Sequence, residues 1–222
     1  MKIKSIFDSV PSELNEKNRR FMLNHVDANG RQNRYANSFE WLGDAGVALP
    51  CYNVTEPLPP LQINARHSLF KLFLNDTGLL CAACMENIQF SILQGDLSVN
   101  LGSILENAIA QQLRSNGFSL WYYDSKKNGE IDFLIQRGMK VELVEVKSGN
   151  DYRRHSSVSK ALAVENWNLE QAYVFCKDNI QRDGNVMYLP WYEVMFLKPA
   201  EIPKGMKYEV DLSGLALADE EI

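Results

Sequence analysis

Residues 130–147 read EIDFLIQRGMKVELVEVK, two apolar stretches separated by Gly138 and Met139. A glycine in the first central position suits a two-residue type II′ hairpin turn. With this turn Arg137 pairs with Lys140, and the register of both strands runs outward from that pair. The sequence therefore predicts a β-hairpin whose open end brings Asp132 opposite Glu145.

The open end of this hairpin gathers charged side chains. Side chains alternate along a strand, so Glu145 and Lys147 share one face. Directly opposed residues have Cβ atoms roughly 4.5–5.5 Å apart, and two carboxylates that close repel each other unless a cation lies between them. Oxygen ligands together with water suit Mg²⁺ or Mn²⁺. The pattern predicts a metal site at Asp132 and Glu145, with Lys147 placed to orient a water or to stabilise charge on a phosphate oxygen.

A simpler interpretation of the same residues is a solvated hairpin with an exposed cross-strand ion pair. The apolar run around Glu145 favours a site, because a carboxylate is costly there without a purpose. A helix ahead of the hairpin adds a further candidate, Glu106, next to Leu105 in the apolar stripe that must pack on the sheet. The alternative for Glu106 is a structural role, in which its negative charge near the helix N-terminus stabilises the helix through the helix dipole.

The elements around the hairpin predict an α/β domain with a mixed sheet. The expected helix at 104–116 has Ser103 as its N-cap and ends at Gly117. The expected elements are the helix 104–116, the strands 118–123, 131–136 and 141–147, the helix 157–164, and the strands 171–176 and 186–189. Their order is α-β-β-β-α-β.

Two further segments of this part have open interpretations. Residues 152–157, YRRHSS, carry basic and hydroxyl groups that either hold a phosphate backbone or form a solvated loop. The aromatic residues Trp121, Tyr122 and Tyr123 either stack on bases or pack in the sheet, and packing is favoured for at least two of them.

The first part of the chain has the order of a winged helix. Three helical stretches, near residues 6–14, 20–25 and 31–49, precede strands expected at 49–54 and 67–73. In such domains the third helix enters a DNA major groove; its polar face would carry Arg31, Asn33, Arg34 and Asn37. A solvated face that packs against a partner is an equal alternative, because acidic residues lie on the same helix. The boundary to the second part is expected near Asp96.

Composition excludes several classes of protein. The chain has 222 residues, 45% of them hydrophobic, and a net charge of −5. These values exclude wholesale disorder, and no apolar run reaches the roughly 18 residues of a membrane span. The N-terminal residues do not have the pattern of a secretory signal. The cytoplasm is the expected compartment, because the four cysteines do not form the pattern of a disulfide framework. Cys81 and Cys84 lack the further ligands of a zinc site and are expected on a buried helical turn.

The second part resembles the PD-(D/E)XK nuclease-like fold in its element order and in Glu106, Asp132, Glu145 and Lys147. The motifs GEIDF at 129–133 and VEVKSG at 144–149 are similar to the C-terminal domain of uncharacterised function in prokaryotic AAA-type ATPases. The stretch LFLNDTGLL at 72–80 resembles the junction ahead of that domain. The resemblance covers most of residues 5–199.

This resemblance implies an N-terminal winged-helix-like domain at 1–96, a PD-(D/E)XK nuclease-like domain at 97–198 and a tail at 199–222. The chain contains no Gly-x-x-x-x-Gly-Lys-Ser/Thr loop, so ATP binding is not carried over and the chain is expected to lack the ATPase domain. The function expected is metal-dependent phosphodiester hydrolysis on DNA, with Asp132, Glu145 and Glu106 as ligands. The alternative is a non-catalytic module that binds DNA or protein and regulates an AAA-type ATPase.

Overall fold

The computed structural model describes residues 2–16, 20–27, 32–84, 90, 94 and 101–201. One mixed sheet of eight strands runs through both parts of the chain, in the order β2-β1-β3-β4-β5-β6-β8-β7. The strands are β1 (Ala48–Val54), β2 (Ala65–Leu74), β3 (Trp121–Ser125), β4 (Gly129–Arg137), β5 (Lys140–Val146), β6 (Ala172–Cys176), β7 (Gln181–Asp183) and β8 (Val186–Pro190). The expected α/β class is therefore confirmed.

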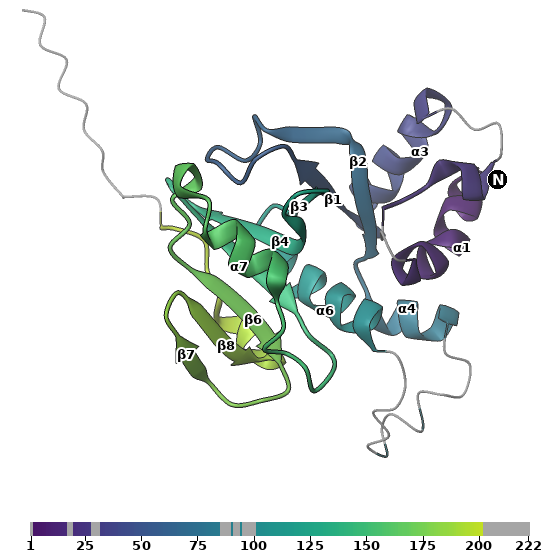
Figure 1. Cartoon of the computed structure of the whole chain (residues 1–222). Coiled ribbons are helices and arrows are strands. Elements are labelled where there is room, and N and C mark those ends of the chain that lie inside the picture. The colour runs from purple at the N-terminus through teal and green to yellow at the C-terminus, as the bar shows by residue number, and fades with distance from the viewer. Residues whose placement is uncertain are drawn as a thin grey trace, which may run out of the picture.

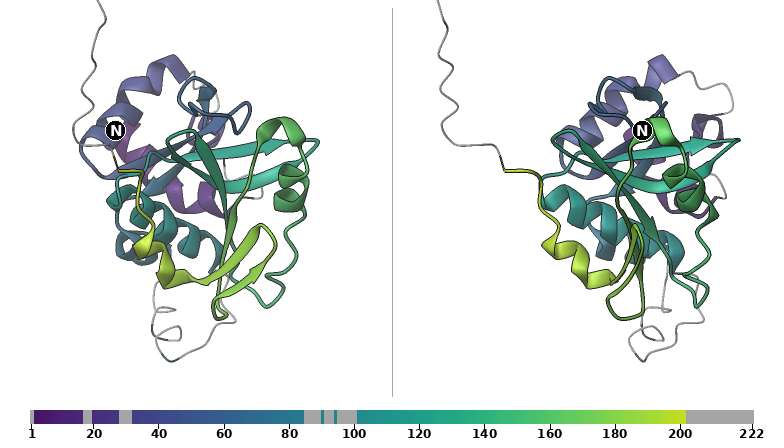
Figure 2. Two further views of the ribbon diagram at one scale, coloured as in Figure 1. Left: turned by 90° about the vertical axis from the view of Figure 1, so that its left-hand side faces the viewer. Right: turned by 60° about the vertical axis from the view of Figure 1, so that its left-hand side comes forward.

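The helices cover both faces of this sheet (Figures 1 and 2). They are α1 (Lys2–Asn15), α2 (Leu23–Val26), α3 (Gln32–Asp44), α4 (Thr77–Cys84), α6 (Gly102–Ser115), α7 (Ser156–Leu162) and the 3₁₀ helices η1 (Glu165–Trp167) and η2 (Trp191–Phe196). The apolar period of α1 buries Ile6, Val10 and Leu14. Gly117, at φ +94°, takes the left-handed conformation just after α6 and ends it as expected.

The alternating strand residues build two hydrophobic cores, one on each face of the sheet. The larger core includes side chains of α1, α4 and α6, among them Leu80 and Ile109. The smaller core lies under α7 and contains Val158, Leu134 and Leu143. Trp121, Tyr122 and Tyr123 are all buried, so their packing role is confirmed.

The two parts of the chain are joined through the sheet, and the buried amide of Asn107 adds to this connection. The predicted order of three helices and a two-stranded ribbon is present, but β1 also pairs in parallel with β3. Asn107 of α6 accepts a hydrogen bond from Leu74 N (2.8 Å) and donates to Leu74 O (2.9 Å) and Thr77 Oγ1 (3.0 Å). Strand β2 is thereby tied to α6, and a boundary near residue 96 stays a prediction.

Several local expectations need correction. Cys84 is exposed and Cys81 half-buried on α4, so the turn that carries them is helical but not buried. The N-cap of α6 is Leu101, without a side-chain cap, rather than Ser103. Strand β7 was not expected, because its three polar residues carry no alternating pattern.

Some expectations fall on parts of the chain that cannot be described. Asp96, Arg31 and the side chains of Asn33 and Arg34 lie outside the described residues, as does most of the predicted tail at 199–222. Among the helices that the structure describes, none is both long and apolar enough to span a bilayer.

Candidate functional site

The β4–β5 hairpin has the predicted register. Arg137 pairs with Lys140, and the pairing continues to Phe133 opposite Val144. Gly138 has φ +61°, the conformation that the first central residue of a type II′ turn requires. The alternation along both strands is therefore the one from which the site was predicted.

Asp132 lies one position beyond the last pair of this ladder. Its Oδ2 accepts a hydrogen bond from the backbone N–H of Val146 at 2.8 Å. The next N–H, that of Lys147, donates to Phe175 O of β6 at 2.8 Å. Successive N–H groups point to opposite sides of a strand. The Val146 N–H therefore points toward β4. The Asp132 carboxylate thus takes the place of a ladder acceptor between the two strands, instead of facing Glu145 as a direct pair.

A β-bulge in β4 accounts for this position. Trp121 and Tyr123 of β3 pair with Leu134 and Ile131 of β4, so β4 contains one residue more than β3 over this span. Bulges bend a strand and re-aim its side chains, and they are frequent beside functional sites. The extra residue falls at 132–133, where it turns the Asp132 carboxylate toward β5.

Glu145 and Lys147 meet on the neighbouring strand. Lys147 Nζ lies 2.6 Å from Glu145 Oε1. Glu145 is 7% exposed, and its other oxygen, Oε2, is buried and has no hydrogen-bond partner in the described part of the chain. Burial, with the charge of Asp132 adding to it, raises the pKa of Glu145 to about 8, although the charge of Lys147 lowers it. The positive charge near this carboxylate therefore does not fully offset its burial and the negative charge of Asp132.

Three of the four predicted site residues are therefore brought together: Asp132, Glu145 and Lys147. Glu106 is 2% exposed on α6, a helix that packs against β1, β2 and β5. It lies in the second turn of that helix rather than the first. Its membership of the cluster stays a prediction.

Lys71 of β2 is a cation of this cluster that the sequence reasoning missed. It is 0% exposed, its Nζ lies 2.5 Å from Glu130 Oε1, and it stands over the Tyr122 ring at 5.0 Å. Its charge lowers the pKa of Glu145, so the two groups lie in one electrostatic environment. The signal was a single lysine in the apolar run SLFKLFL, where an ionised group needs a partner.

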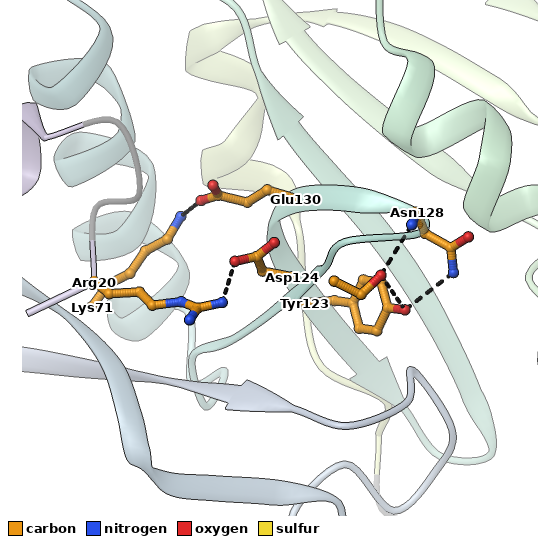
Figure 3. Close-up of polar contacts among 7 residues, drawn as sticks. Arg20, Lys71, Tyr123, Asp124, Asn128 and Glu130 are labelled. Carbon is orange, nitrogen blue, oxygen red and sulfur yellow. Dashed lines mark hydrogen bonds and ion pairs between the residues drawn. The ribbon is translucent and has the colours of Figure 1, made fainter.

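A second cation from the first part of the chain contacts β3, the other neighbour of β4 in the sheet. Arg20 forms an ion pair with Asp124 of β3, and Asp124 is paired across the ladder with Glu130. Figure 3 shows Arg20 and Lys71 approaching these two carboxylates from the same side. The turn end of the β3–β4 hairpin is thus held by two charged side chains from the N-terminal region.

The electrostatics fit a divalent cation with few protein ligands. Mg²⁺ is commonly held by one or two carboxylates together with water and substrate phosphate. Asp132 and Glu145 suit that arrangement, because Oε2 of Glu145 is buried without a hydrogen-bond partner among the described residues. Within the described ranges, no group of three or more His, Cys, Asp and Glu side chains is arranged to hold a metal ion. The role of Glu106 as a third ligand stays a prediction.

The structure also contains a groove that the residues of the charged cluster do not line. It has a volume of about 760 Å³ and is lined by α3, β1 and β2, with Phe39, Tyr52 and Trp121 among its walls. Asp132, Glu145 and Lys147 do not line it.

Comparison with known proteins gives two matches to domain families. Residues 1–89 match a domain of unknown function, DUF8612. No curated protein and no solved structure matches the chain. Residues 101–194, which contain the whole β4–β5 hairpin and its charged cluster, match the domain of unknown function DUF4143, a domain found in AAA-ATPase-associated proteins.

Proposed function

We propose that the cluster of Asp132, Glu145 and Lys147 is the site of a metal-dependent phosphodiesterase that acts on nucleic acid, with DNA as the expected substrate. The observation that carries this proposal is the position of the Asp132 carboxylate between β4 and β5, beside the partly buried ion pair of Glu145 and Lys147. Two carboxylates and a lysine in that arrangement suit the hydrolysis of a phosphodiester bond.

In this proposal Asp132 and Glu145 hold Mg²⁺ or Mn²⁺. The metal, when bound, stabilises the negative charge that develops on the phosphoryl group. Lys147 keeps an ammonium group at the rim of the site, 28% exposed, where it donates hydrogen bonds to a phosphate oxygen or to the attacking water. The Val146 N–H holds the Oδ2 atom of Asp132 in place beside the ion pair.

A second candidate is a non-catalytic module that regulates an AAA-type ATPase. The observation that favours it is Lys71, whose buried ammonium already supplies positive charge near Glu145 and Glu130. Such an internal cation offsets part of the carboxylate charge without a metal. The domain that residues 101–194 match is found in AAA-ATPase-associated proteins, so an ATPase is the partner this candidate would regulate.

Cleavage assays separate the two candidates. Labelled DNA is incubated with Mg²⁺ or Mn²⁺ and with the wild type, Asp132→Asn, Lys147→Met or Lys140→Met. Lys140 is a matched control, because it lies at the opposite end of β5 and pairs with Glu170 in an exposed contact. We expect cleavage by the wild type and the control only. Equal cleavage by all four proteins refutes the assignment, and Mn²⁺ binding without cleavage favours the regulatory module.

A further inference from the structure

Positive charge is concentrated in the segment that follows β5. Residues 147–160 contain four basic side chains, Lys147, Arg153, Arg154 and Lys160, and one acidic side chain, Asp151, within a chain of net charge −5. Arg153, Arg154 and Lys160 are exposed. A local basic surface on an acidic protein points to an anionic partner.

Arg153 is held in place rather than free to move. Its guanidinium group lies over the ring of Tyr188 at 5.2 Å and over that of Tyr152 at 5.6 Å, and its Nη2 donates to Gln181 Oε1 at 2.5 Å. His155 supports the same ring through a 2.7 Å contact between its Nε2 and the Tyr188 hydroxyl. A guanidinium fixed in this way loses little conformational entropy when it binds phosphate.

Lys177 adds a cation from the neighbouring strand. The strands β5 and β6 are parallel, and Val146 is paired with Phe175 near their ends. Lys147 therefore follows one strand end and Lys177 lies just beyond the other. The Lys177 ammonium contacts the side chain of Asn150, in the loop between β5 and α7. These groups form a basic ledge, which we define as Lys147, Arg153, Arg154 and Lys177.

The helix that follows the ledge, α7, lies against the start of β4. A side chain at Gly129 would collide with Ser157 of α7, so this helix sits directly on the strand three residues before Asp132. Acidic residues offset part of the ledge: Asp151 pairs with Arg154 at 3.2 Å, and Asp178 accepts a 2.5 Å hydrogen bond from the Tyr152 hydroxyl. The guanidinium of Arg153 has five N–H donors, so donors remain beyond its hydrogen bond to Gln181.

We propose that the basic ledge binds the phosphate backbone of a nucleic-acid strand and presents that strand to the carboxylate cluster. Cleavage of the strand rests on the function proposed above, whereas binding does not. Planar guanidinium donors suit phosphate, and hydroxyl groups beside them, here on Ser156 and Ser159, are common backbone contacts. An acidic polypeptide is the competing partner, and it lacks the phosphate geometry that a fixed guanidinium recognises.

The test measures binding without chemistry. Fluorescence anisotropy follows a labelled DNA oligonucleotide in EDTA, over a series of salt concentrations, with the full chain. Proteins are the wild type, Lys177→Ala, Arg153→Gln, their double variant, and Lys140→Ala as the control. We expect the double variant to bind at least about tenfold more weakly. The slope of log K against log salt concentration should also be less steep, by the amount that corresponds to the loss of about two phosphate contacts. Lys140→Ala is expected to match the wild type.

Three results would overturn the proposal that the ledge binds nucleic acid: no binding by the wild type, equal binding by the double variant, or displacement of DNA by poly-glutamate at equal charge concentration. Circular dichroism shows whether each variant is folded. If the double variant does not fold, the single variants Lys177→Ala and Arg153→Gln, which change exposed side chains, still test the proposal. Because EDTA removes divalent metal, failure of the proposed cleavage leaves this outcome unaffected.

Discussion

The Nζ atom of Lys71 lies 2.5 Å from Oε1 of Glu130, and this ion pair links the second strand of the chain to the strand that carries Asp132. Lys71 is completely buried, whereas the Glu130 side chain is 26% exposed. A buried ammonium without its carboxylate is much less favourable than a carboxylate that can still reach water. The two partners should therefore respond unequally to substitution.

Removal of Glu130 is expected to destabilise the protein more than removal of Lys71. Glu130→Gln leaves the buried ammonium without its nearest partner and should lower the free energy of unfolding by about 3 kcal/mol. Lys71→Met removes the buried charge itself and should cost less. Urea denaturation of the two single variants and the double variant measures the coupling. A smaller loss in Glu130→Gln than in Lys71→Met would contradict this account.

The stability of Glu145→Gln relative to the wild type should depend on pH. The pKa of Glu145 is raised from 4.5 to about 8. Below about pH 4.5 both folded and unfolded chains hold the proton; as the pH rises toward 8 the unfolded chain loses it first, so the stability of the wild type falls. The glutamine stays neutral, and its advantage should grow over this window, by on the order of a few kcal/mol.

Thermal unfolding between pH 4 and 9, without divalent metal, checks this prediction. Glu170→Gln serves as the control, because the ion pair with Lys140 lowers the pKa of Glu170. That variant should show a small effect of the opposite sign. A pH-independent difference between Glu145→Gln and the wild type would be inconsistent with a raised pKa.

Substitutions of Asp132 should separate its structural role from its proposed chemical role. Asp132→Asn keeps an oxygen that can accept the hydrogen bond from Val146 N, so its stability should stay close to that of the wild type. Asp132→Ala leaves that buried N–H unpaired and should cost about 1–3 kcal/mol. Mn²⁺ binding, measured by calorimetry, is expected to be lost in both. Retention of Mn²⁺ affinity in Asp132→Asn would remove this residue from the set of metal ligands.

Gly129 should tolerate no side chain. It has φ +85°, and an added Cβ would collide with Ser157. Gly129→Ala is therefore expected to lower the free energy of unfolding by about 3 kcal/mol, from strain and overpacking together. Gly138→Ala is the matched control, because Gly138 also has a positive φ, +61°, but no atom within 4 Å of the added Cβ. Chemical denaturation should show a loss of only about 1 kcal/mol there, and equal losses would argue against the contact with α7.

The hairpin of the site was predictable because its determinants are local. The Gly138-Met139 turn sets the pairing of Arg137 with Lys140, and strand alternation then places Glu145 and Lys147 together. These relations need only neighbouring residues. The bulge at 132–133 was not predictable in this way, because it is defined by the pairing of β4 with β3 on its other side.

Lys71 and Arg20 could not be assigned to the site from the sequence. Their partners, Glu130 and Asp124, lie far along the chain, and β2 reaches the site only through the pairing of β1 with β3. A winged-helix order suggests a ribbon that stands apart, whereas here the ribbon extends the sheet. Long-range strand pairing of this kind leaves no periodic pattern in a single sequence.

The parallel contact between Tyr52–Val54 and Trp121–Tyr123 also has a consequence for synthesis on the ribosome. The edge of β1 that pairs with β3 leaves the ribosome with its backbone groups unpaired. Some seventy further residues must be synthesised before β3 is available to pair with it. During that interval the nascent chain exposes an open strand edge, the kind of surface that templates aggregation. A polypeptide released early, before β3 is made, should therefore depend on chaperones in a way that the finished protein does not.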